Sequence, residues 1–169
     1  MLYNFNNEPN LYSMKRDKVL LMTFVGLLFI RCSNKEVGDK TGTEITDKIV
    51  IKVSEAIING KGNLFISATT KDVYPCANYT IDTDFNAKNT SFNIYYKKII
   101  VPVTCLDALG VASNKIEIGT LPNGTYNLEL HVPSGKSNGV LKVSATELQL
   151  NFRKTKGIEI PEPIVKRVK

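Results

Sequence analysis

The reactive side chains of this 169-residue sequence include three cysteines and a single histidine. Cys76 and Cys105 enclose a loop of about 30 residues, and a disulfide between them would stabilise the fold by about 3.5 kcal/mol at most. An even pair of cysteines favours such a bond in an oxidising compartment. Two buried free thiols are the alternative. Because these cysteines and His131 lie far apart and fall short of four ligands, the sequence predicts no zinc site.

A catalytic role for His131 would need a nucleophile within hydrogen-bond reach of its ring. The histidine falls instead on the polar side of an alternating segment, beside Glu129, where a solvent-facing strand residue is expected. Residues 135–137 look like the end of a phosphate-binding loop, but the glycine required five residues earlier is Leu130. We therefore predict no catalytic site, no cofactor and no enzymatic activity.

Oxygen-bearing side chains alternate at Asp82, Asp84 and Asn86, as they do at the start of an EF-hand calcium loop. The later glycine and glutamate of that motif are missing, so the segment is not an EF-hand. These three residues are a calcium candidate in a loop, with help from Asp72 or Asp107. Ordinary polar turn residues are the alternative.

The third cysteine, Cys32, follows a short apolar run. Basic residues within 14–18 precede residues 19–30, which carry no charge. As a helix these 12 residues would reach about 18 Å, which is shorter than the apolar core of a bilayer, about 30 Å. The length matches the apolar region of a secretory signal. We predict that residues 1–31 are a signal segment and that the true start is Met14.

Residues 14–36 resemble the signal of bacterial lipoproteins, in which a lipid such as palmitate is attached to the cysteine that begins the mature chain. The resemblance implies a lipid anchor on Cys32 and a place in the cell envelope, at the outer membrane, on its periplasmic or surface side. Phe29 and Arg31 depart from the usual box, which has Leu and a small residue there. Lipoproteins of the Bacteroides group tolerate such boxes, and the Asn- and Lys-rich composition is similar to theirs. A cleaved signal and an uncleaved interfacial anchor are the alternatives.

The basic charge is concentrated at one end of the chain. Residues 32–169 carry 18 Lys and Arg against 14 Asp and Glu, and residues 153–169 hold six of these bases and two of these acids. The remainder, residues 32–152, balances at 12 against 12. A nucleic-acid-binding domain would show a basic face, so no nucleic-acid partner is predicted.

Three regions follow the signal. Residues 32–47 are rich in Lys, Thr, Gly and acidic residues and favour a flexible tether. Residues 48–152 alternate apolar and polar side chains with period two, as half-buried strands do, and form the predicted domain. Residues 153–169 are a basic tail or a final strand.

Two segments change alternation phase, at residues 97–98 and at residues 146–147, which indicates a bulge, a tight turn or a strand that crosses between sheets. Pro102 places its strand at an edge or a bulge. The pair Asn123–Gly124 predicts a turn with positive φ. Cys76 is out of phase with the strand after it, which puts the disulfide near a strand end.

Residues 116–152 resemble immunoglobulin-like and fibronectin-like modules, in which a Leu-Pro-x-Gly-x-Tyr turn leads into a late strand. The expected fold is all-β: an immunoglobulin-like antiparallel β-sandwich of about 7–9 strands.

The sequence favours a membrane-tethered binding or accessory module whose partner is an envelope protein or a glycan. Tyr95, Tyr96, Lys97 and Lys98 are the candidate contact surface, because exposed aromatic and cationic side chains suit such partners. The alternative for the tyrosines is one core and one surface residue. The alternative function is a structural or assembly subunit of an envelope complex that adds a strand at an open edge.

Overall fold

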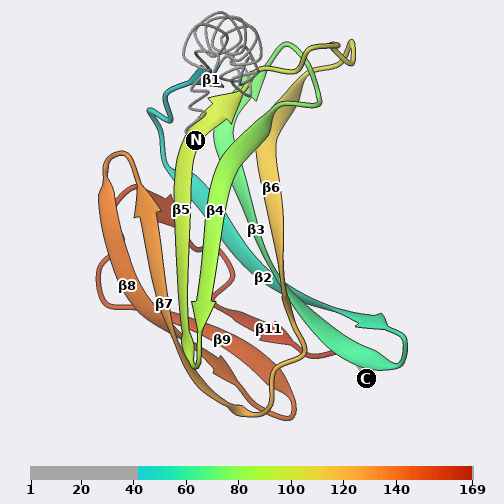
Figure 1. Ribbon diagram of the computed structural model, residues 1–169, viewed down its shortest axis with the longest axis vertical. Helices are drawn as coiled ribbons and strands as arrows, with labels where there is room; N and C mark the ends of the chain where they lie inside the picture. The colour runs from blue at the N-terminus through green and yellow to red at the C-terminus, as the bar shows by residue number, and fades with distance from the viewer. Residues whose placement is uncertain (1–41, 169) are drawn as a thin grey trace, which may run out of the picture. The chain divides into compact units, whose positions relative to one another are not determined.

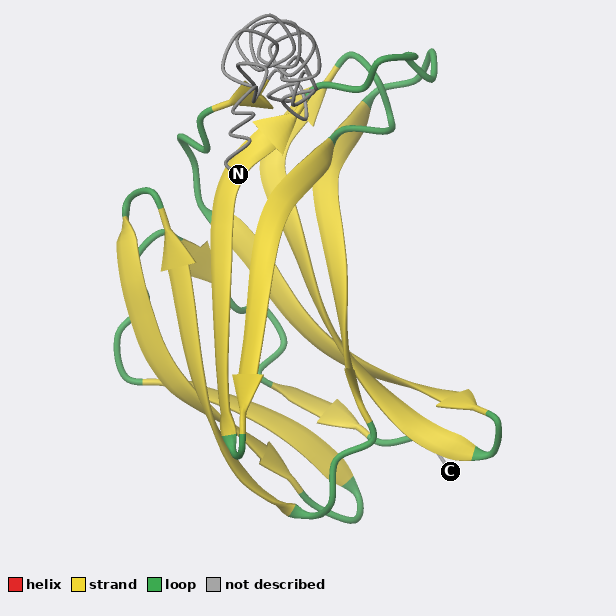
Figure 2. Cartoon of the chain, viewed as in Figure 1, coloured by secondary structure: helices red, strands yellow, loops and turns green. Residues whose placement is uncertain are grey.

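The computed structural model describes residues 42–168, which form eleven β-strands joined by loops (Figure 1; Figure 2). The all-β prediction is confirmed. In this part of the chain there is no helix long and apolar enough to cross a membrane. The strands are β1 (Gly42–Thr43), β2 (Ile49–Ile58), β3 (Lys61–Tyr74), β4 (Thr80–Lys88), β5 (Ser91–Ile100), β6 (Gly110–Gly119), β7 (Gly124–Val132), β8 (Gly135–Val143), β9 (Glu147–Phe152), β10 (Ile158–Glu159) and β11 (Ile164–Lys166).

One continuous sheet joins these strands in the order β10-β2-β3-β6-β4-β5-β7-β8-β9-β11, with β1 paired to β5 beside this path. The sheet curls, which brings β2 into contact with β9 (Figure 1). Three pairs are parallel, namely β10 with β2, β4 with β6, and β5 with β7. The purely antiparallel arrangement expected from the sequence is therefore wrong. The cause is β6, which runs between β3 and β4, so that β7 starts from the same end of the sheet as β5.

The inward side chains of the curled sheet form one apolar core, as the period-two pattern predicts. Burial of this surface is the main term that stabilises the fold. Its largest fully buried side chains are Ile49, Ile51, Leu64, Ile66, Ile81, Ile94, Ile99, Leu128, Leu130, Leu141, Leu148 and Ile158.

Both predicted phase changes are confirmed as local features. In β5, Lys98 faces Asp82 and Tyr96 faces Thr83, so Lys97 is the extra residue of a β-bulge. The second change is a tight turn between β8 and β9, where the Ser144 hydroxyl accepts a hydrogen bond from the backbone of Glu147 at 3.0 Å. Pro102 lies in the loop after β5 and does not interrupt a strand.

The turn chemistry differs from the prediction. The hairpin between β2 and β3 uses Asn59 and Gly60 with φ of 51° and 73°, values that Asn and Gly tolerate best. Gly124 is not among the positive-φ residues. Its turn is fixed instead by Tyr126, whose hydroxyl donates to the carbonyl of Pro122 at 2.8 Å.

The two ends of the predicted domain extend further than expected. At the N-terminal side, β1 lies within the segment predicted as a tether, and Ile45 is buried. At the C-terminal side, the region predicted as a basic tail or a final strand contributes β10, which pairs with β2, and β11, which pairs with β9. We call residues 158–168 the strap, because they connect the two ends of the strand path. Short edge strands of this kind limit pairing with other chains.

Candidate functional site

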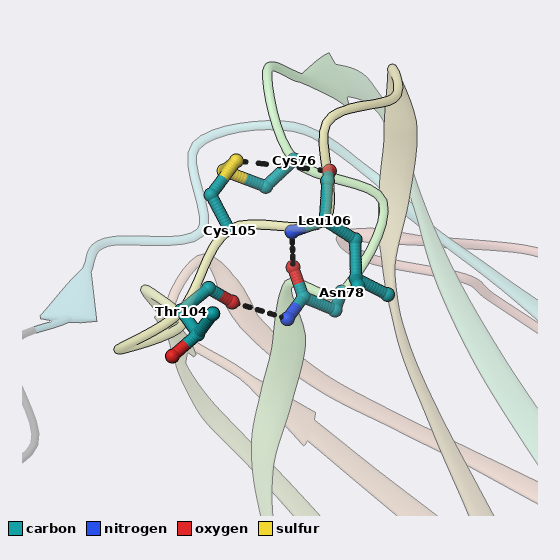
Figure 3. The surroundings of a disulfide bond; sticks show 5 residues. All are labelled: Cys76, Asn78, Thr104, Cys105 and Leu106. Atoms are coloured by element: carbon teal, nitrogen blue, oxygen red, sulfur yellow. Dashed lines mark hydrogen bonds between the residues drawn. A yellow bond between two sulfur atoms is a disulfide. The ribbon is translucent and has the colours of Figure 1, made fainter.

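Cys76 and Cys105 form the predicted disulfide, with their Cα atoms 5.2 Å apart (Figure 3). Cys76 lies in the loop between β3 and β4, and Cys105 lies in the loop between β5 and β6. The bond is thus near strand ends, as the phase of Cys76 suggested. Cys32, the predicted lipid site, and residues 1–41 as a whole lie outside the described part of the chain.

Asn78 reinforces the same junction. Its side-chain amide donates to the carbonyl of Thr104 at 2.7 Å, and its side-chain oxygen accepts from the backbone nitrogen of Leu106 at 3.1 Å (Figure 3). The backbone nitrogen of Ala77 donates to the carbonyl of Leu106 at 3.2 Å. We call the joined loops, residues 75–79 and 101–109, the stapled tip. The sequence predicted its disulfide but gave no sign of the role of Asn78.

The predicted contact surface on β5 is divided by the strand. Tyr96 is only 2% exposed and belongs to the core, so it cannot be a surface residue. Adjacent strand residues point to opposite faces, which is the physical reason for this correction. Burial raises the pKa of the Tyr96 hydroxyl, and this hydroxyl has no hydrogen-bond partner. Lys97 is exposed and pairs with Asp84 at 2.6 Å. The role of Tyr95, Lys97 and Lys98 in binding stays a prediction.

Tyr95 joins His131 on the outer side of the sheet, with the two rings stacked at a centroid distance of 4.2 Å. The His131 Nε2 donates to Glu129 Oε1 at 2.5 Å, and Lys136 Nζ donates to Glu129 Oε2 at 3.0 Å. These contacts, led by Lys136, hold the pKa of the Glu129 carboxyl below its usual range. One ring nitrogen of His131 is thus paired with a carboxylate.

Polar side chains continue from this cluster across three strands. Asn93 on β5 lies opposite Glu129 on β7, which lies opposite Asn138 on β8. Side chains at paired positions share one face of the sheet. We call this set the polar face. Its members are Ser91, Asn93, Tyr95, Asn127, Glu129, His131, Lys136 and Asn138.

Two open hollows mark the polar face. One of about 260 Å³ is lined by Asn93, Glu129 and Asn138, among others. The second, of about 510 Å³, shares Asn138 and Gly139 with the first and extends to Arg153. Together they form a shallow path across β5, β7, β8 and β9, and the polar groups along it could bind an elongated polar molecule.

The calcium candidate is not assembled by the fold. Asp82, Asp84 and Asn86 lie along β4 instead of in a loop, so their side chains are spread along the strand. Asp84 is engaged by Lys97. Among residues 42–168, no three His, Cys, Asp or Glu side chains gather as metal ligands would.

An ion pair that the sequence did not reveal joins β2 to the strap. The side chain of Glu55 is 1% exposed and lies 2.6 Å from Arg167 Nη2. It also accepts from Arg167 Nε at 3.0 Å and from the backbone nitrogen of Val168 at 3.0 Å. The Arg167 hydrogen bond is the main cause that lowers the pKa of Glu55. The partners are 112 residues apart in the sequence, so no local pattern could indicate this contact.

No family model matches the chain, and the comparisons found no similar curated protein and no similar solved structure.

Proposed function

We propose that this protein is an extracytoplasmic module, held at the outer membrane by a lipid on Cys32, that binds a glycan through its polar face. The observation that carries the binding role is the row of Asn93, Glu129 and Asn138, which lie abreast beside two connected hollows.

The chemistry of the polar face suits neutral hydroxyl-rich ligands. Each Asn carboxamide offers donors and an acceptor at once, as paired sugar hydroxyls require. Pockets for small apolar ligands are enclosed, whereas these hollows are open and shared between neighbouring strands. The ion pair between Glu129 and Lys136 removes a strong local charge, so a neutral glycan is favoured over a phosphate-rich polymer.

The anchoring role is supported by the signal-like residues 14–36 and is compatible with the disulfide, since such bonds persist in oxidising compartments. We propose no catalytic step and no cofactor.

The alternative is a structural or assembly subunit. Strand addition at the ends of the sheet has little support, because the strand path ends on β10 and β11, which are 2 and 3 residues long. An assembly partner would have to use side-chain surfaces instead.

A glycan array probed with the purified full chain tests the binding role, followed by calorimetry with the best ligand. Asn93→Ala and Asn138→Ala should each weaken binding about tenfold, because each leaves ligand hydroxyls unpaired. Asn123→Ala, the same change in the turn before β7, is the matched control and should bind normally. Equal affinity in all variants, or capture of an envelope protein with no glycan bound, would contradict the proposal.

A further inference from the structure

Exposed apolar side chains gather at the stapled tip. Of the nine large hydrophobic residues exposed in the described part of the chain, five lie in these loops or directly beside them. Val103 is fully exposed, Leu109 is 77% exposed and Leu106 is 58% exposed. The other two, Val73 and Val111, face each other across β3 and β6. Contiguous exposed apolar groups of this kind mark interaction sites.

The tip holds these side chains in place. Its two loops are fixed by the disulfide and by both ends of the Asn78 carboxamide (Figure 3). A free loop could fold its apolar side chains back onto the core, but a loop that is stapled to its neighbour cannot do so without breaking these bonds. The ordering cost of binding is therefore met before a partner arrives.

The chain enters the domain at this same end of the sheet. β1 pairs with β5 through Gly42 and Ile100, and Ile100 directly precedes the second loop of the tip. Ten positions separate Cys32 from Gly42. Even fully extended, such a segment spans about 35 Å at most. A lipid on Cys32 would thus keep Gly42, at this end of the sheet, within this distance of the membrane.

We infer that the stapled tip inserts its apolar side chains into the bilayer to which the chain is anchored. This inference rests on the anchoring part of the proposed function. The two hollows described above are lined by no residue of the tip. Asp72 and Asp107 adjoin the apolar groups, so the contact is hydrophobic and does not depend on anionic lipid.

The opposite end of the sheet carries a second group of exposed apolar side chains, which could contact the membrane instead of the tip. The other four exposed hydrophobic residues lie there, in the β2–β3 hairpin and the strap, and none exceeds 52% exposure. Ile57 in that hairpin is 48% exposed, a fraction similar to the 58% of Leu106, and is therefore a matched control site.

A single tryptophan reports which end meets the lipid, since the sequence contains none. The full lipidated chain is purified from bacterial membranes as Leu106→Trp or as Ile57→Trp. Each variant is reconstituted in phosphatidylcholine vesicles with or without bromine on the acyl chains. We expect Leu106→Trp fluorescence to fall roughly twofold with brominated lipid, because interfacial insertion reaches the acyl boundary. Ile57→Trp should be unchanged.

The outcomes separate this inference from the anchor. Vesicle flotation of both variants without quenching of Leu106→Trp would overturn the inference alone, as would quenching of Ile57→Trp only. A blue shift of Leu106→Trp that grows with protein density but ignores bromine would show a second copy on the tip, and would also overturn it. Failure of the chain to float would overturn the anchor, and the inference with it.

Discussion

Different interactions hold the two ends of the curled sheet together: a disulfide at one end and an ion pair at the other. At the stapled tip, a covalent bond connects exposed loops and leaves apolar side chains in water. At the other end of β3, a carboxylate with 1% exposure is matched by Arg167 of the strap. A disulfide acts mainly by restricting the unfolded chain and needs no burial, whereas a buried charge is tolerated only with its partner in place. The comparison teaches that one end is free to present a surface, while the other serves the fold.

Removing Arg167 should have the largest effect on stability. Arg167→Ala removes the hydrogen bonds from Arg167 to the Glu55 carboxylate and to the Ser144 carbonyl, and each hydrogen bond to a charged group contributes about 1.5–3 kcal/mol. Arg167→Lys keeps the charge but loses the paired guanidinium contacts, so an intermediate loss is expected. Urea unfolding measures both, with Lys166→Ala on exposed β11 as the control. Equal stability of Arg167→Ala and the control would show that the strap does not close the fold.

Removing the disulfide should be the next largest change. Cys76→Ala together with Cys105→Ala should lower the free energy of unfolding by about 2–4 kcal/mol. Reductant should destabilise the natural chain by a similar amount and leave the double variant unchanged. Thermal unfolding with and without reductant gives the comparison, and a reductant effect of the same size on both chains would contradict it.

Lowering the pH should weaken the ion pair between Glu55 and the strap and should leave the disulfide of the stapled tip intact. The folded-state pKa of Glu55 is lowered from 4.5, so its contribution is present above that value and is lost as pH falls through the lowered pKa. Stability should therefore drop below about pH 4.5, and Arg167→Ala should show a smaller drop because the shift is mainly due to that residue. Urea midpoints across this pH range measure the difference. If the urea midpoint of Arg167→Ala fell with pH as much as that of the natural chain, the loss of stability in acid would come from other carboxylates.

Removing the hydroxyl group from either of two tyrosines should have the smallest effects on stability, and the two effects should differ. Tyr126→Phe removes the hydrogen bond to Pro122 and should cost about 1 kcal/mol. Tyr96→Phe removes a buried hydroxyl that has no partner, so it should be neutral or slightly stabilising. Urea unfolding of both variants checks the order, and a larger loss at Tyr96 would contradict it.

Features encoded by local periodicity could be predicted from the sequence. The all-β class, the change of face at Lys97 and the turn before β9 all follow from alternation with period two. The disulfide followed from cysteine number and expected compartment. The burial of Tyr96 agrees with the alternative of one core and one surface tyrosine, because Tyr96 has the same alternation phase as the buried Phe92 and Ile94.

Features that depend on distant contacts could not be predicted. The parallel pairing of β5 with β7 depends on where β6 runs, which no local pattern encodes. The region of the strap stayed open between a basic tail and a final strand, because β10 and β11 are too short for alternation to be visible. The polar face was missed because its row forms only when β5 and β7 are paired. The calcium candidate failed for the converse reason: its spacing suits a loop, but the segment is a strand.

The central claim is that Cys32 carries a lipid that holds this domain outside the cytoplasm. Metabolic labelling with palmitate, fractionation and thiol alkylation of one sample test it directly, beside Cys32→Ser as the control. The account predicts a labelled chain in the outer membrane with Cys76 and Cys105 protected from alkylation, and an unlabelled Cys32→Ser variant that leaves the membrane. An unlabelled natural chain in the cytosol, with both thiols free, would contradict it.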